Sequence, residues 1–270
     1  MEERRSRSER KTEKIMNEQN EQRLIQCILD AGELILKSGG EISRVEDTMI
    51  RMFRAYGFLR ADVFTITSSI VVTVSTKEGK ILTQTRRVSG YDMNLERVHL
   101  MNQLARDVCA EPLELEELER RMEAVRTSKE LSPAQMVWVY GAVAAVFSVF
   151  FGGGILEALL GGITGMGLCL LLQLLEQPIT NAIVRYALGA ALGGLFLGLV
   201  KKCGVNYLIE PALMGNIMLL IPGIPFTNAI RDMLNGDTMS GMLRMCESLL
   251  RTIAVAAGFV GVLTMLGGLM

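Results

Sequence analysis

Five long stretches without charged residues occupy the second half of the sequence and constrain its fold more than any other feature. Of the charged residues, 45 lie in residues 1–135 and only 12 in residues 136–270. The uncharged stretches are residues 131–156, 158–175, 186–200, 211–230 and 252–270. A helix needs about 20 mostly apolar residues to cross a bilayer. Three of the stretches are long enough by themselves. The other two are long enough only if Glu157 and Arg185 lie near a membrane face or inside a bundle. A water-soluble protein with buried helices is the alternative, which five successive stretches disfavour.

We therefore predict an all-α polytopic membrane bundle of about five transmembrane helices in residues 131–270. The predicted spans cover residues 134–151, 154–174, 180–200, 207–226 and 246–268, to within a few residues. Small residues recur in them at four-residue spacing, which lets neighbouring helices approach closely. The pairs are Gly161 with Gly165, Gly189 with Gly193, Gly194 with Gly198, and Ala257 with Gly261. A lipid bilayer is the expected surrounding of this half of the chain.

The first half has the patterns of a small folded domain. Apolar residues at helical spacing predict four helices, and a period of two between the second and third predicts an antiparallel sheet. The predicted elements are helices in residues 22–37, 42–56, 95–108 and 115–125, and strands in residues 61–67, 69–76 and 80–88. Residues 1–21 lack an apolar segment, and we expect a disordered polar arm there. The predicted fold is thus an α+β soluble N-terminal domain, residues 22–130, followed by the membrane bundle.

Positive charges near the ends of the predicted spans set the expected orientation. Five lie on the side of the N-terminal domain, and Lys201 and Lys202 lie on the other side. The five are Arg126, Lys129, Arg185, Arg231 and Arg244. Since Lys and Arg are enriched in cytoplasmic loops, we expect the N-terminal domain in the cytoplasm and the chain in the cell (inner) membrane.

Motifs of enzymes and metal sites are not found in the sequence. It has no GxSxG, HExxH, P-loop or GxGxxG pattern, a single histidine, His99, and five cysteines without a CxxC pair. Ser43 with Asp47 could be arranged as a hydrolytic pair, but helix capping and solvated polar faces explain such residues better. We expect no enzyme, no catalytic residues, no cofactor, no metal and no nucleic-acid partner.

The fourth predicted span contains a helix-breaking segment, IPGIP. Pro222 and Pro225 each remove a backbone donor and crowd the carbonyl four residues earlier, and Gly223 adds freedom. The helix must kink or unwind there, and a bilayer tolerates this only inside a bundle or beside a water-filled cavity. Broken helices near the midplane expose polar backbone to the solute in many secondary transporters.

Polar residues around this break are candidates for a transport site. The candidate solute-binding residues are Asn216, Pro222, Gly223, Pro225, Asn228, Arg231, Asp232 and Asp237. Arg231 could hold a solute carboxylate as a bidentate fork. Glu210, at the start of the span, is the candidate for proton coupling. Alternatively, the segment is only the turn that ends span four, with Arg231 and Asp232 in a cytoplasmic loop; the two interpretations have about equal support.

Other charges in the spans have simple explanations. Glu157 and Arg185 either reach towards the membrane faces or pair across spans two and three. Glu247 and Arg251 are four residues apart on one predicted helix, so an ion pair on the helix surface explains both.

Three parts of the sequence occur in a familiar combination. They are GGEISRVEDTMIRMFRAYG, the strand pair TITSSIVVTVST and LTQTRRV, and GNIMLLIPGIPFTNAIRDMLNGDTMSGMLRMCESLL. Together they resemble the threonine/serine exporter (ThrE) family in its short, split form, from about residue 22 to the C-terminus. The resemblance implies a cytoplasmic N-terminal domain, membrane spans, and export of threonine, serine or, in split members, succinate, driven by the proton motive force.

The resemblance also implies a partner. Longer family members carry a second membrane unit behind the first, which this sequence does not contain, so a separate small membrane subunit, a homo-oligomer or both are expected. The predicted function is a subunit of a secondary exporter of small polar metabolites. The alternative from another class is a membrane-anchored sensor or scaffold whose N-terminal domain binds a small ligand or a partner.

Overall fold

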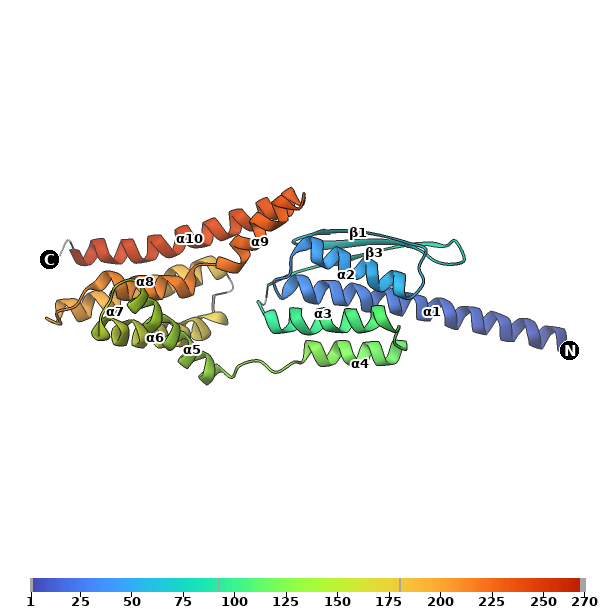
Figure 1. The fold of residues 1–270 in the computed structure, drawn as a ribbon, viewed down its shortest axis with the longest axis horizontal. Helices are drawn as coiled ribbons and strands as arrows, with labels where there is room; N and C mark the ends of the chain where they lie inside the picture. The colour runs from blue at the N-terminus through green and yellow to red at the C-terminus, as the bar shows by residue number, and fades with distance from the viewer. Residues whose placement is uncertain (1, 92, 180, 268–270) are drawn as a thin grey trace. The chain divides into compact units, whose positions relative to one another are not determined.

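The computed structural model describes residues 2–91, 93–179 and 181–267. The chain divides into two compact units (Figure 1). Unit 1 comprises Met1–Lys129 and Thr227–Arg244, and unit 2 comprises Glu130–Phe226 and Met245–Met270. A segment from late in the sequence therefore belongs to the same unit as the N-terminal half.

Unit 1 has helices packed against a small antiparallel sheet. Its elements are α1 (Glu2–Lys37), α2 (Ile42–Ala55), β1 (Arg60–Ile66), β2 (Ser69–Ser75), β3 (Ile81–Arg87), α3 (Leu95–Ala110), α4 (Leu115–Arg126), most of α9 (Gly223–Leu234) and the first turns of α10 (Thr238–Gly267). The strand order is β1-β2-β3, with Val72 of the central strand paired to Val63 and Gln84. In Figure 1, α1, α3 and α4 run side by side.

The core of unit 1 follows from the alternation of its residues. Ile70, Val72 and Val74 on β2 are fully buried, whereas the residues between them are half-exposed. They join large side chains of α1, α2 and α3, among them Phe53 and Met101, in one apolar cluster. This arrangement, with large apolar groups inside, is what burial from water favours.

Unit 2 is helical. It contains α5 (Pro133–Phe150), α6 (Ile155–Glu176), α7 (Ala182–Lys202), α8 (Ile209–Leu220) and α10 from Met245 onwards. Among the described residues, four helices are long and apolar enough to cross a membrane, namely α5, α6, α7 and α10. The pair α8 and α9 passes the same test only together and is bent by 55° at the break.

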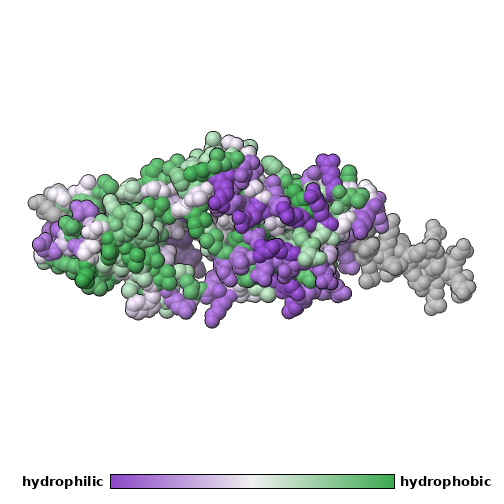
Figure 2. All heavy atoms as spheres, viewed as in Figure 1, coloured by the Kyte–Doolittle hydropathy of each residue, from purple (hydrophilic) through white to green (hydrophobic). Residues whose placement is uncertain are grey.

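Small residues form the inner contacts of unit 2. A Cβ added at Gly215 on α8 would lie 2.4 Å from the carbonyl oxygen of Ala144 on α5, and one at Gly258 on α10 would lie 2.4 Å from that of Ala187 on α7. A smaller cluster of large apolar side chains, which includes Leu197 and Phe259, is also buried. Many other large apolar side chains point outwards, and Phe150 and Leu174 are 75% and 74% exposed. Figure 2 shows hydrophobic side chains gathered over these helices.

The predicted fold class is wrong in one respect. We expected an α+β soluble N-terminal domain that ends before the membrane bundle begins. The described chain is instead mostly helical, with ten helices and one three-stranded sheet, and a separate soluble domain is not found. Unit 1 includes Thr227–Arg244 from the second half of the sequence. Contacts between residues about 190 positions apart cause this, and local periodicity carries no information about them.

Candidate functional site

The break between α8 and α9 lies at Ile221 and Pro222. Ile221 has extended backbone angles, and the amide of Gly223 donates a hydrogen bond of 2.9 Å to its carbonyl. Pro222 has no amide hydrogen to continue the ladder of α8. Pro225 lies in the first turn of α9, where a missing donor is tolerated. The helix therefore ends at Leu220 and restarts in a new direction.

Asp232 on α9 acts as the cap of a distant helix. It is 0% exposed, and its Oδ1 accepts a hydrogen bond of 3.1 Å from the amide of Ile42, the first residue of α2. Glu41, the residue at the cap position of α2, makes no such bond with its own side chain. A carboxylate at a helix N-terminus satisfies a free amide and is attracted by the helix dipole. Asp232 thus stabilises the start of α2 from the other end of the sequence.

Arg244 on α10 balances the charge of Asp232. It is 5% exposed; its Nη1 lies 3.2 Å from Oδ2 of Asp232, and its Nη2 donates a 2.9 Å hydrogen bond to the carbonyl of Gly40. Asp232 Oδ2 and Arg244 Nε have no hydrogen-bond partner among the described residues. The two charges compensate one another, and removing either would leave the other buried alone.

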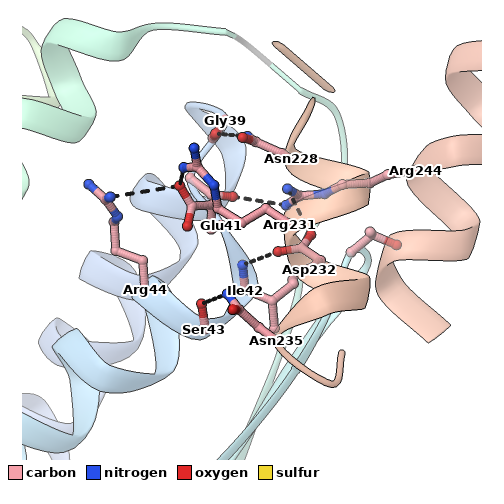
Figure 3. A network of polar contacts seen from close by, with 12 residues as sticks. Gly39, Glu41, Ile42, Ser43, Arg44, Asn228, Arg231, Asp232, Asn235 and Arg244 are labelled. Carbon is pink, nitrogen blue, oxygen red and sulfur yellow. Dashed lines mark hydrogen bonds and ion pairs between the residues drawn. The ribbon is translucent and has the colours of Figure 1, made fainter. Parts of the chain in front are cut away.

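Two further side chains of α9, and Asn235 directly after it, bind the loop between α1 and α2 and the start of α2 (Figure 3). Asn228 donates a 2.8 Å hydrogen bond to the carbonyl of Gly39, Asn235 donates one of 3.1 Å to Ser43, and Arg231 pairs with Glu41. We call the set the Asp232 network; its members are Gly39, Gly40, Glu41, Ile42, Ser43, Asn228, Arg231, Asp232, Asn235 and Arg244. The network joins two of the sequence stretches that carry the family resemblance.

The candidate solute-binding residues thus have different surroundings. Asn228 and Asp232 are buried and bound to the chain itself, whereas Arg231 pairs with Glu41 and its side chain is 51% exposed. Asp237 follows α9 and is half-exposed; its amide donates to the carbonyl of Asp232. None of these contacts tests a role in transport, which stays a prediction.

The remaining candidates belong to unit 2. Asn216 on α8 is 0% exposed, and its Nδ2 donates to the carbonyls of Gly161 and Ala212 at 3.2 and 2.8 Å. Its Oδ1 has no partner among the described residues. Pro222 is buried, and Glu210 is exposed in the first turn of α8. Asn216 thus ties α8 to α6 and keeps one acceptor unused.

Glu157 on α6 is a polar residue whose partners the sequence did not reveal. It is 8% exposed, and its two carboxylate oxygens accept hydrogen bonds from the amides of Leu208 at 2.9 Å and Gly154 at 2.8 Å. It therefore links the N-terminal ends of α6 and α8. The structure does not pair Glu157 with Arg185. In the sequence, only its position within an apolar stretch indicated that Glu157 is unusual.

Unit 1 contains a small cavity of about 240 Å³ between α1 and α4. Charged groups of both signs line it, including Arg23, Asp30 and Arg126. Burial raises the pKa of Asp30, and the Arg86 guanidinium, 2.7 Å away, opposes this rise. Burial also raises the pKa of the Cys27 thiol to about 12, which makes it unreactive. Two of the lining charges are paired within the chain, Arg23 with Glu119 and Asp30 with Arg86, each at 2.7 Å.

Comparisons with known proteins match most of the chain to one family and to relatives in two bacteria. The family model described as "Putative threonine/serine exporter" (ThrE) matches residues 26–266. The "Probable succinate transporter subunit YjjP" of Klebsiella aerogenes is 25% identical over 244 residues, 90% of this chain and 92% of that protein. The protein of the same name from Escherichia coli K12 is 25% identical over 259 residues, 93% of this chain and 98% of its own length. No solved structure matches the chain.

Proposed function

The chain belongs to the threonine/serine exporter (ThrE) family, and on this premise we propose that it is one subunit of a secondary transporter that exports small polar metabolites. The solutes are amino acids of the threonine/serine type or a dicarboxylate such as succinate, the solute in the names of the two relatives. The proton motive force drives the export. The chain lies in the cell (inner) membrane, with unit 1 on the cytoplasmic side.

The broken pair α8 and α9 is the observation that carries this proposal. A helix interrupted at Pro222 has backbone groups that need partners other than lipid. Broken helices of this kind provide such groups to solutes and coupling ions in secondary transporters. Asn216 lies on one side of the break with a buried, unused acceptor, and Arg231 lies on the other with an exposed guanidinium. We propose that Asn216 contacts the solute within unit 2 and that Glu210 takes part in proton coupling there, while Arg231 is a separate candidate contact within unit 1.

The first test uses the two prolines of the break as a matched pair. Pro222→Ala restores the missing donor and favours a continuous helix, so we expect efflux to fall at least about tenfold while the amount of protein in the membrane is unchanged. Pro225→Ala changes a first-turn position, and we expect efflux within about twofold of the wild type. Equal efflux in both variants would remove the break from the transport mechanism.

The partner subunit is tested by reconstitution. Counterflow of labelled serine, threonine and succinate is measured in proteoliposomes that contain this chain alone or with the small membrane protein that co-purifies with it. We expect transport only when both are present, because both relatives are named as subunits. Full transport by this chain alone would contradict the two-subunit proposal but not the transporter itself.

Two native cysteines test the orientation. If unit 1 is cytoplasmic, exposed Cys203 at the end of α7 faces the outside, and exposed Cys109 on α3 faces the inside. We expect a membrane-impermeant maleimide added to intact cells to label the wild type and not the Cys203→Ser variant. Cys109→Ser serves as the control and should not change labelling. If Cys109→Ser lowers the labelling and Cys203→Ser does not, unit 1 lies on the outside and the proposed orientation is wrong.

A sensor is the second candidate function, and the cavity between α1 and α4 favours it. If the cavity binds a regulatory ligand, serine, threonine or succinate should raise the melting temperature of the full chain. A ligand at 100 times its dissociation constant adds about 2.7 kcal/mol of stability. Stabilisation that disappears in Arg126→Gln, together with no transport in the complete complex, would favour the sensor over the transporter.

A further inference from the structure

Arg251 is a charged residue within the membrane-spanning part of α10. It is half-buried, and its guanidinium carbon lies 5.2 Å from the centre of the Tyr186 ring on α7. Its Nε is buried and has no hydrogen-bond partner among the described residues. A guanidinium that stacks on an aromatic face keeps the edge that carries its donors free for an anion.

The ion pair that the sequence suggested for Arg251 is not formed. Glu247 lies one turn earlier on α10, but no carboxylate of the described residues lies within 4.0 Å of Arg251. Ionisable groups in membrane-spanning segments are costly and are usually paired. Arg251 is therefore a positive charge whose anionic partner is absent from the described part of the chain.

We infer that Arg251, stacked on Tyr186, is a binding subsite for a carboxylate group of the transported solute. This inference rests on the proposed transport function and adds a chemical class to it. The planar guanidinium binds a carboxylate through two parallel hydrogen bonds, which a lysine ammonium cannot reproduce. Tyr186 fixes the plane of the guanidinium, so it is a positioning residue. A lipid phosphate could occupy the same subsite, and the experiment below separates the two.

The test measures succinate transport by the complete complex in proteoliposomes. We expect Arg251→Gln to raise the KM for succinate about 10- to 100-fold, since hydrogen bonds to a charged group contribute that factor. Arg251→Lys keeps the charge without the fork and should raise it less. Tyr186→Leu should raise it about 3- to 10-fold, and Tyr186→Phe, which keeps the ring, less than twofold.

Controls separate a binding role from a structural one. Lys202→Gln removes an exposed positive charge at the end of α7 and should leave KM unchanged. The wild type should prefer succinate to succinamate, in which one carboxylate is an amide, and Arg251→Gln should lose that preference. A KM that stays at the wild-type value in Arg251→Gln would overturn the subsite.

Two further outcomes are informative. Vesicles with and without anionic lipid distinguish a solute carboxylate from a lipid phosphate. If Arg251→Gln lowers activity only in anionic vesicles and leaves the preference for succinate unchanged, the subsite binds a lipid phosphate. That result would overturn the inference. If the wild-type complex transports none of the solutes, the proposed function fails. If the complexes that carry Arg251→Gln and Tyr186→Leu both transport succinate as the wild type does, only the subsite fails.

Discussion

The cores of unit 1 and unit 2 differ in how far they depend on small residues. In unit 1, large side chains such as Phe53 and Met49 are fully buried. In unit 2, α5, α6 and α8 approach one another at Gly161, Ser148 and Gly215; a smaller apolar cluster that includes Leu197 and Phe259 is buried, and many other large apolar side chains lie on the outside. The first pattern is produced by burial from water. The second is expected where lipid surrounds the helices and close backbone approach drives their association.

Most of α9 belongs with unit 1 although α8, the helix before it, belongs with unit 2. Its buried residues include Asn228 and Asp232, which hydrogen-bond to the loop after α1 and to the start of α2. Only a segment with polar partners can bury such groups cheaply. The boundary between the units, after Phe226, therefore lies about one turn beyond the break at Pro222.

The largest expected effect comes from the buried charges that attach α9 to unit 1. Asp232→Ala leaves Arg244 buried without its partner and the amide of Ile42 without its acceptor. We expect a loss of about 3–5 kcal/mol in the free energy of unfolding, measured by denaturation of the purified chain in detergent. Such a loss would show that α9 is an integral part of unit 1.

The exposed member of the same network serves as the matched control. Arg231 pairs with Glu41, but its side chain is 51% exposed. An exposed pair of this kind contributes about 0–1 kcal/mol. Similar losses for Arg231→Ala and Asp232→Ala would contradict the distinction between buried and exposed members. If Arg231→Ala is stable but lowers efflux, the exposed guanidinium has a role in transport.

The packing of unit 2 predicts an intermediate effect. A Cβ at Gly215 would lie 2.4 Å from the backbone oxygen of Ala144, so α5 and α8 must separate in Gly215→Ala. Overpacking of this kind costs about 1–3 kcal/mol, which a lower melting temperature in detergent should reveal. Gly167 on α6 has nothing within 4 Å of an added Cβ. Gly167→Ala should therefore leave the melting temperature unchanged or slightly raised, and a large loss there would contradict the packing rule.

Local patterns were sufficient to predict most elements of both units. Alternation in residues 69–76 predicted β2 (Ser69–Ser75), because one face of that strand packs on the helices. The uncharged stretches predicted α5, α6, α7 and α10, since crossing a bilayer requires length and apolarity and both can be read from the sequence. The break at Pro222 could also be predicted from the sequence, because a proline interrupts the helix in which it lies.

The assignment of α9 to unit 1 could not be predicted in this way. Asp232 and Ile42 are 190 residues apart, and neither residue type indicates the other as its partner. The sequence did single out Asn228, Arg231 and Asp232 as unusual polar groups near a helix break. It could not show that all three are bound to the chain itself, because a polar side chain has the same signature in the sequence whether its partner is a solute or another part of the chain.

The smallest expected effect concerns the pH dependence of unit 1. Burial raises the pKa of Glu46 on α2; the amide of Thr65, 2.7 Å away, opposes this rise, and Asp237 adds to it. The folded state then holds the proton more tightly than the unfolded chain does. The contribution of Glu46 to the free energy of unfolding should rise as the pH falls from 7 towards the raised pKa, and stop changing below the unfolded value of about 4.3. Glu46→Gln should remove this contribution.

Glu117 on α4 provides a control of the opposite sign. Hydrogen bonds from Arg120 and Arg121 lower its pKa to about 2. Its contribution to stability is therefore present above about pH 4.3 and is lost as the pH falls towards 2. The free energy of unfolding is measured by denaturation at pH 4.5 and at pH 7. Lowering the pH from 7 to 4.5 should stabilise Glu46→Gln less than it stabilises the wild type, and Glu117→Gln should respond nearly as the wild type does. If Glu46→Gln keeps the wild-type difference, Glu46 is not held in a dry part of unit 1, and the contrast between the two cores does not extend to this edge of the sheet.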